Sequence, residues 1–145
     1  MKGYLVDTNI PSELTREKPD ARVELFLDRA GKGSVFLSVL TIGEICNGIA
    51  NLPPSQKRIG LQDWLDRTVR SWFSGRILPV TEEIAERWGN LAATAKRKGM
   101  TLAVVDGVIA ATALHHGLTL VTRNVRDFAG LGVEIFNPWD ETSPS

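Results

Sequence analysis

Short apolar strands alternate with helical segments along this chain, and this alternation limits its fold more than any other feature. The predicted strands are short runs rich in Val, Leu, Ile and Phe at 4–6, 35–37, 77–80, 118–122 and 133–136. Helical spacing of apolar residues predicts helices at 10–14, 20–30, 39–50, 55–73, 81–98 and 107–116. Strands that alternate with helices usually form a parallel sheet covered on both faces. We therefore predict an α/β fold, a three-layer α/β/α sandwich with a central, mostly parallel sheet.

The length and charge of the chain indicate one ordinary globular domain. Its 145 residues suffice for a hydrophobic core, and we predict a single domain over 1–139 followed by a frayed tail over 140–145. Lys and Arg together number 17, as do Asp and Glu, so a nucleic-acid site would have to be a local patch. The single cysteine, Cys46, excludes an internal disulfide. Because no signal peptide or long apolar run is evident, we expect a cytoplasmic protein that does not enter a membrane.

The first predicted strand ends in an acidic residue. Tyr4–Val6 is followed by Asp7, Thr8 and Asn9, and then by a helical segment. In an open parallel sheet, ligands and reactive groups gather at the carboxyl ends of the strands. Alternatively, Asp7 or Asn9 caps the next helix, because Asp, Thr and Asn are all good N-cap residues. This stretch alone favours neither interpretation.

Three later acids should lie at the same edge of the sheet as Asp7. Glu44 is in the first turns of the helix that follows the second strand, and Asp127 is in the loop after the strand at 118–122. Asp106 begins a helix that precedes a strand, and such a helix runs back across the sheet from the carboxyl edge. The topology therefore brings together four carboxylates that are far apart in the sequence.

Each of these acids also has a purely structural interpretation. Glu44 completes a capping-box pattern with Thr41, Asp106 is a possible N-cap, and Asp127 has Arg123 and Arg126 as nearby partners. Against this, Glu44 and Asp106 interrupt apolar segments, where a charge is costly unless it is compensated. Converging carboxylates repel one another, and a divalent cation compensates them. Oxygen ligands suit Mg²⁺ or Mn²⁺, which can activate water for phosphodiester cleavage.

Four segments of the chain resemble PIN-domain ribonucleases, in particular the VapC/FitB-like toxins of bacterial type II toxin–antitoxin pairs. These segments are Leu5–Asn9, Leu37–Ile45, Val105–Ala113 and Leu120–Phe128. The resemblance implies a PIN-like fold and a Mg²⁺-dependent endoribonuclease, with Mn²⁺ as a possible substitute. It places the metal ligands and catalytic acids at Asp7, Glu44, Asp106 and Asp127.

The resemblance also implies supporting residues and partners. The polar shell of the site would comprise Thr8, Asn9, Ser38 and Thr122, with Asn124 as an alternative to Asp127. The expected partners are an RNA substrate, a second copy of the chain, and an antitoxin that covers the acidic edge with a basic side chain.

Basic and aromatic residues suggest where such partners could bind. Arg123 and Arg126 are candidates for contacts with RNA phosphates, although ordinary solvated cations are an equal alternative. The helix at 55–73 carries Trp64 and Trp72, which pack in the core or present an apolar strip to a partner.

Other functions remain as alternatives. A Mg²⁺-binding phosphoryl-transfer domain or a receiver-like domain also uses an acidic pocket. However, Asn9 stands where a haloacid-dehalogenase-like phosphatase has its second acid, and Asp106 and Asp127 do not end a central strand as a receiver requires. A dinucleotide-binding fold is disfavoured because no Gly-x-Gly-x-x-Gly motif follows a strand.

Overall fold

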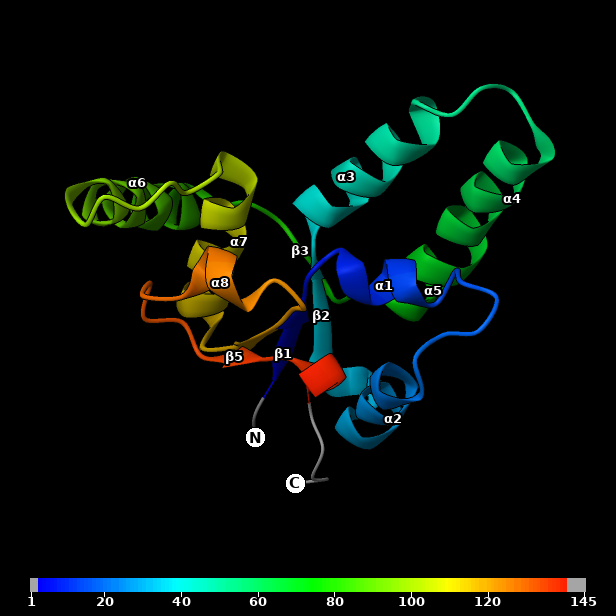
Figure 1. Cartoon of the computed structure of the whole chain (residues 1–145), viewed down its shortest axis with the longest axis horizontal. Helices are drawn as coiled ribbons and strands as arrows, with labels where there is room; N and C mark the ends of the chain where they lie inside the picture. Colours follow the sequence, from blue (N-terminus) through cyan, green and yellow to red (C-terminus); the bar gives the residue numbers. More distant parts are fainter. Residues whose placement is uncertain (1–2, 141–145) are drawn as a thin grey trace.

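The computed structural model describes residues 3–140 and contains one sheet of five parallel strands (Figure 1). Along the sheet, the strands are ordered β3-β2-β1-β4-β5. Their bounds are Tyr4–Val6 (β1), Val35–Ser38 (β2), Ile77–Leu78 (β3), Thr119–Val121 (β4) and Ile135–Phe136 (β5). The predicted parallel sheet is confirmed, and β3 is an edge strand, the position in a sheet that tolerates the adjacent Pro79.

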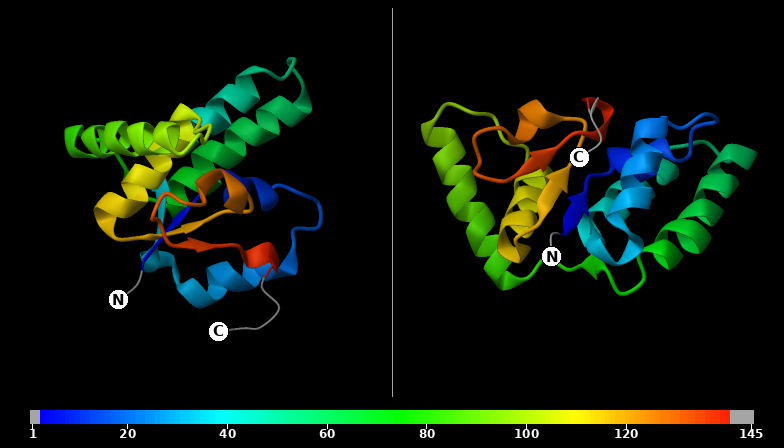
Figure 2. Two further views of the ribbon diagram at one scale, coloured as in Figure 1. Left: turned by 60° about the vertical axis from the view of Figure 1, so that its left-hand side comes forward. Right: turned by 90° about the horizontal axis from the view of Figure 1, so that it is seen from below.

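Helices cover both faces of this sheet, so the predicted three-layer architecture is also confirmed. They are α1 (Asn9–Glu13), α2 (Ala21–Ala30), α3 (Val39–Ala50), α4 (Gln56–Trp64), α5 (Arg70–Trp72), α6 (Glu82–Arg97), α7 (Val104–His116) and α8 (Val125–Phe128). Figures 1 and 2 show α6, α7 and α8 on one side of the strands and α1, α2, α4 and α5 on the other. No helix of residues 3–140 is both long and apolar enough to cross a membrane.

The central strands β1, β2 and β4 are mostly buried on both faces, which explains their apolar sequences, whereas the edge strands β3 and β5 are half-buried. Successive residues of a strand point to opposite faces. Val6 and Val121 accordingly pack in the cluster formed with α2, α3 and the α4–α5 segment, whereas Leu5 and Leu120 pack against α6 and α7. Residues 107–113 of α7 are all buried, as the apolar sequence of this helix predicts.

Several predicted elements differ in detail from the structure. Helix α7 begins at Val104, three residues before the helix predicted at 107–116, and the loop predicted around Asp127 contains the helix α8. The helix expected at 55–73 is interrupted by a π-helical turn at Leu65–Val69, which joins α4 to α5. Asp140, which was expected to be the first residue of a frayed tail, instead belongs to the 3₁₀ helix Pro138–Asp140 and accepts a hydrogen bond from Asn137 Nδ2. The remaining predicted tail residues, 141–145, lie outside the described part of the chain.

The strand order creates a switch point beside β1. After β1, the chain adds β2 and β3 on one side, and it then adds β4 and β5 on the other. Crevices form at such a point, outside the carboxyl ends of the strands. Asp7 directly follows β1 and Thr122 directly follows β4, so both residues lie at this crevice.

Candidate active site

Asp7 is held at the switch point by hydrogen bonds from uncharged groups. Its side chain is 6% exposed. Oδ1 accepts the backbone N–H of Thr8 at 2.8 Å, and Oδ2 accepts the hydroxyl of Thr122 at 2.9 Å. Burial raises the pKa of Asp7, and Asp127 adds to this increase, although the two hydrogen bonds oppose it. No side chain caps α1, so the capping interpretation of Asp7 and Asn9 is wrong.

Thr122 connects Asp7 to the loop that follows β4. This buried hydroxyl accepts hydrogen bonds from Asn9 Nδ2 at 3.3 Å and from the backbone N–H of Asn124 at 3.0 Å. Asn9 Oδ1 in turn accepts the backbone N–H of Arg123 at 3.4 Å. The side chains of Asn9 and Thr122 therefore fix the carboxylate of Asp7 relative to the segment that carries Asp127.

Asp106 lies in the first turn of α7, two residues beyond the first helical residue, Val104. The N-cap residue is Ala103, so the alternative interpretation of Asp106 as an N-cap is wrong. Burial is the largest cause of the rise in its pKa to about 6, followed by the charges of Asp7, Asp127 and Glu44. A helix N-terminus favours a negative charge, so the raised pKa shows that burial and repulsion outweigh the helix dipole.

Glu44 reaches the acidic edge from α3, but its surroundings differ from those expected. Ser38 is the N-cap of α3 and accepts the Leu40 N–H at 3.1 Å, so Glu44 lies in the second turn and cannot complete a capping box. Its side chain is exposed, which corrects the expectation of a costly charge within an apolar segment. The hydroxyl of Thr8 donates to Glu44 Oε1 at 2.5 Å, so Thr8 contacts both Asp7 and Glu44.

Asp127 lies in α8 and is exposed, yet its charge raises the pKa of both Asp7 and Asp106. Within residues 3–140 it forms no ion pair with Arg123 or Arg126, the partners that a structural interpretation would require. The guanidinium of Arg123 instead lies over the ring of Trp139, with Cζ 5.1 Å from the ring centroid. No pattern in the sequence predicts this contact.

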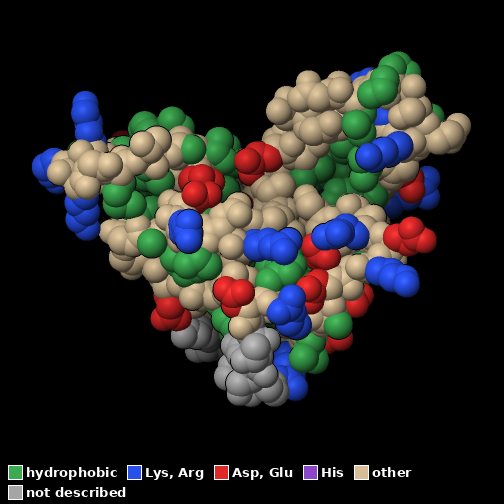
Figure 3. All heavy atoms as spheres, in the orientation of Figure 1, with side chains coloured by type: hydrophobic (Ala, Val, Ile, Leu, Met, Phe, Trp, Pro, Cys, Tyr) green, Lys and Arg blue, Asp and Glu red, His purple; other side chains and the backbone are tan. Residues whose placement is uncertain are grey.

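The four acids share one region, and no Lys or Arg of the described chain forms an ion pair with them. The ion pairs among residues 3–140 are Glu13–Arg16, Asp20–Arg22, Asp63–Arg67 and Asp66–Arg70. Figure 3 shows Asp and Glu side chains at the base of the notch between the α6–α7 arm and α3. In this part of the chain, no three His, Cys, Asp or Glu side chains are close enough to enclose a metal ion. The site is therefore an open acidic crevice.

Comparison with known proteins identifies this arrangement. The sequence profile of the PIN-domain family matches residues 4–133, which is nearly the whole chain. The chain belongs to the PIN-domain family. The family predicted from the four sequence segments is thereby confirmed.

Two relatives align with this chain over almost their full length. Toxin FitB of Neisseria gonorrhoeae is 39% identical over 137 residues, which cover 94% of this chain and 99% of that protein. VapC ribonuclease Y4jK of Sinorhizobium fredii is 35% identical and covers 94% of this chain and 97% of its own length.

Solved structures agree with the PIN fold. The crystal structure of FitAcB from Neisseria gonorrhoeae matches with a TM-score of 0.89 and 38% identity, over 95% of this chain and 99% of that chain. The structure of FitAB bound to an IR36 DNA fragment matches with a TM-score of 0.90 and 36% identity, over 98% and 99% of the two chains.

Proposed function

We propose that this PIN domain is a metal-dependent endoribonuclease that acts as the toxin of a toxin–antitoxin pair. One observation carries the proposal: the pKa of Asp106 is raised to about 6, partly by three neighbouring acids, in a crevice where no Lys or Arg of residues 3–140 pairs with them. A fold keeps such repulsion when a ligand relieves it, and perturbed carboxylates in a crevice are typical of catalytic sites. The named relatives, a toxin and a ribonuclease, support the same function.

The donors fit a magnesium ion. Mg²⁺ retains several of its waters and is usually bound by one or two carboxylates together with substrate phosphates. Asp7 and Asp106 would hold the ion, and Glu44 and Asp127 would add negative charge around it. All the donors are oxygen atoms, so Mn²⁺ should substitute. When bound, the metal would polarise the phosphodiester and lower the pKa of a coordinated water.

The side chains around Asp7 have a positioning role in this proposal. Thr122 and the Thr8 N–H each bind a different oxygen of the Asp7 carboxylate, which keeps its plane fixed. Asn9 orients Thr122, and the Thr8 hydroxyl orients Glu44. Asp106 must be ionised to bind a cation, so metal-free protein should acquire its metal affinity as the pH rises through about 6.

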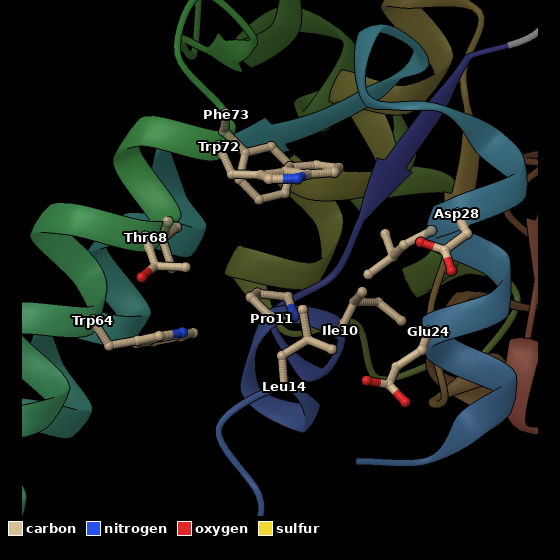
Figure 4. A pocket seen from close by; sticks show the side chains of 11 residues that line it. Ile10, Pro11, Leu14, Glu24, Asp28, Trp64, Thr68, Trp72 and Phe73 are labelled. Atoms are coloured by element: carbon tan, nitrogen blue, oxygen red, sulfur yellow. The ribbon is translucent and has the colours of Figure 1, made fainter.

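We propose that the antitoxin binds an apolar groove beside the acidic crevice. Figure 4 shows Trp64 and Trp72 facing Pro11 of α1 and Leu14, which directly follows α1, across this cavity of about 440 Å³. The exposed acids Glu24 and Asp28 of α2 line its far side and suit a basic partner. The groove contains none of the four acids of the crevice.

Helix α1 makes the groove continuous with the acidic crevice. It starts at Asn9, next to Asp7 and Thr8, and its Ile10 and Pro11 line the groove. A partner helix in the groove that continues past the start of α1 could therefore place an Arg or Lys among the carboxylates. The two solved neighbours named above are FitAcB, and FitAB bound to a DNA fragment.

The function is tested by incubating the purified protein with total RNA in millimolar Mg²⁺, then adding EDTA, and then restoring Mg²⁺. We expect cleavage that EDTA stops and Mg²⁺ or Mn²⁺ restores. Cleavage that persists in excess EDTA would contradict the metal requirement. Absence of cleavage, combined with phosphorylation by acetyl phosphate, would instead favour a receiver-like domain.

The groove is tested by measuring binding of the expected antitoxin, the protein that the neighbouring gene encodes. Trp64→Ala should weaken binding of that protein, whereas Ile59→Ala should not, because Ile59 is exposed on α4 and does not line the groove. Equal affinity for Trp64→Ala and the wild type would exclude the groove as the antitoxin site.

We also propose that the protein forms a homodimer. Sedimentation as a monomer at micromolar concentration would contradict this proposal.

A further inference from the structure

A polar pocket adjoins the acidic crevice on the side of β5. It encloses about 380 Å³ and is lined by residues 123–127 after β4 and by Asn137 and Asp140 after β5. Asp127 belongs to both sites, since its charge acts on Asp7 and Asp106 while its side chain lines the pocket. An RNA strand that places a phosphate at the acidic crevice would therefore place an adjacent nucleotide at this pocket.

Arg123 presents hydrogen-bond donors to the pocket from a fixed position. Its guanidinium lies over the ring of Trp139, which is 5% exposed and is itself fixed by a 2.9 Å hydrogen bond from its backbone N–H to Asn137 Oδ1. An arginine held over an aromatic ring can direct the N–H donors of its planar guanidinium outward to a ligand. Asp20 lies within electrostatic range of Arg123, but its carboxylate forms its ion pair with Arg22 at 2.8 Å. Arg123 itself forms no ion pair within residues 3–140.

Asp140 and Asn124 provide acceptors. Asp140 Oδ2 accepts Asn137 Nδ2 at 3.2 Å, and Arg22 lies within electrostatic range of the same carboxylate. Asp140 Oδ1 accepts no hydrogen bond from any described residue. The amide side chain of Asn124 is also unpaired within residues 3–140, because its hydrogen bond to Thr122 comes from the backbone. The pocket thus has a planar pair of donors and a carboxylate acceptor.

Guanine matches this combination better than the other bases. Its O6 and N7 accept two hydrogen bonds from one arginine, which is the commonest specific contact between proteins and bases. Its N1–H and N2 amino groups are donors that a carboxylate accepts, whereas adenine presents an acceptor at N1. We propose that the pocket binds a guanine base of the RNA next to the cleaved phosphate, with Arg123 and Asp140 as the residues that recognise the base. Arg126, which is exposed and unpaired within residues 3–140, would contact a phosphate of the same nucleotide.

This inference extends the proposed ribonuclease function, but it can be tested without cleavage. The probes are GMP, IMP and AMP, titrated into metal-free wild-type protein while amide and indole signals are recorded by NMR. We expect GMP to bind about tenfold or more tightly than AMP, in line with the value of one bidentate contact. IMP, which lacks the N2 amino group, should fall between them. The shifted signals should be those of Trp139 and residues 123–127, and equal affinity for GMP and AMP would overturn the proposal.

Matched variants assign the recognition to particular residues. Arg123→Lys retains the charge but loses the bidentate geometry, so it should reduce the preference for GMP over AMP and leave only the part that Asp140 provides. Asp140→Asn should bring the affinities for GMP and IMP together. Arg126→Lys is the control: it should affect GMP and AMP equally. A preference for GMP that is undiminished in Arg123→Lys would show that Arg123 does not recognise the base.

The RNA assay separates failure of this inference from failure of the proposed function. If the wild type cleaves RNA with no dependence on guanine near the cut, the function stands and the guanine pocket is wrong. If GMP binds with the expected preference but RNA is never cleaved, the pocket stands and the ribonuclease proposal fails.

Discussion

Asp20 and Asp106 both lie at the start of a helix, but their carboxylates have opposite electrostatic surroundings. Asp20 caps α2, accepts the backbone N–H of Arg22 and pairs with its guanidinium, and these interactions lower its pKa to about 2. For Asp106, burial and three acidic neighbours raise the pKa to about 6. The comparison teaches that position in a helix does not reveal the role of an acid. The presence or absence of a cation partner separates a structural acid from a candidate metal ligand.

The largest expected contrast is in catalysis. Asp106→Asn should reduce RNA cleavage about 100-fold or more, because the substitution removes a charged ligand from the proposed metal site. A bound metal ion contributes several kcal/mol to phosphodiester cleavage. Asp20→Asn should leave the rate unchanged, since Asn is also a good N-cap and Asp20 is outside the crevice. Initial rates on one RNA, with circular dichroism to confirm folding, test this pair. Full activity of Asp106→Asn would remove that residue from the site.

The second contrast is in stabilisation by metal. Mg²⁺ at a concentration of about ten times its Kd should stabilise the wild type by about 1.4 kcal/mol. This corresponds to an increase in Tm of about 3–5 °C. Asp7→Asn should lose most of this increase, because a ligand is removed and the repulsion with Asp106 is relieved. Asp20→Asn should retain it. An equal increase for wild type and Asp7→Asn, measured by calorimetry, would argue against Asp7 as a ligand.

The smallest contrast is in the pH dependence of stability without metal. A raised pKa means that the folded state binds the proton more tightly, so the Asp106 contribution to stability falls as the pH rises from about 4 to about 6. Asp106→Asn should therefore stabilise the protein above pH 6. We expect the free energy of unfolding to increase by about 1 kcal/mol. This is less than half of the free energy that corresponds to the full change in the Asp106 pKa, because water screens a partly exposed carboxylate.

Asp20 should show the opposite sign. Its lowered pKa means that its contribution is present above about pH 4 and is lost as the pH falls toward 2. Asp20→Asn should therefore slightly destabilise the protein at neutral pH. Urea denaturation in EDTA at about pH 2, pH 4 and pH 8 measures both effects, and changes of the same sign in the two variants at pH 8 would undermine the comparison.

The sequence predicted the features that depend on chain order. Strand–helix alternation implied the parallel sheet, and parallel connections implied that Asp7, Glu44, Asp106 and Asp127 share an edge. The starts of α2, α3 and α6 also follow local sequence, because a good N-cap residue (Asp20, Ser38 or Thr81) precedes each helix and its side chain accepts a helix N–H.

The features that were missed depend on where a helix begins and on contacts between distant segments. Asp106 was expected to be the first residue of its helix, but Ala103 provides the N-cap without any side-chain hydrogen bond, so no sequence signal marks that start. Glu44 was expected to be a costly charge because the sequence of α3 is apolar, but its side chain lies on the exposed face of the helix. The Arg123–Trp139 stack joins segments that follow different strands, and only the folded sheet brings them together.

The central claim is that the acidic crevice requires a cation, and the most direct test is the titration of Asp106 itself. Carboxyl ¹³C NMR should follow this side chain from pH 3 to pH 8, first in EDTA and then in saturating Mg²⁺. The account predicts a pKa near 6 without metal and a value well below 6 with Mg²⁺, because a cation favours the ionised form. A pKa near the ordinary aspartate value in EDTA, or one that Mg²⁺ does not change, would contradict it.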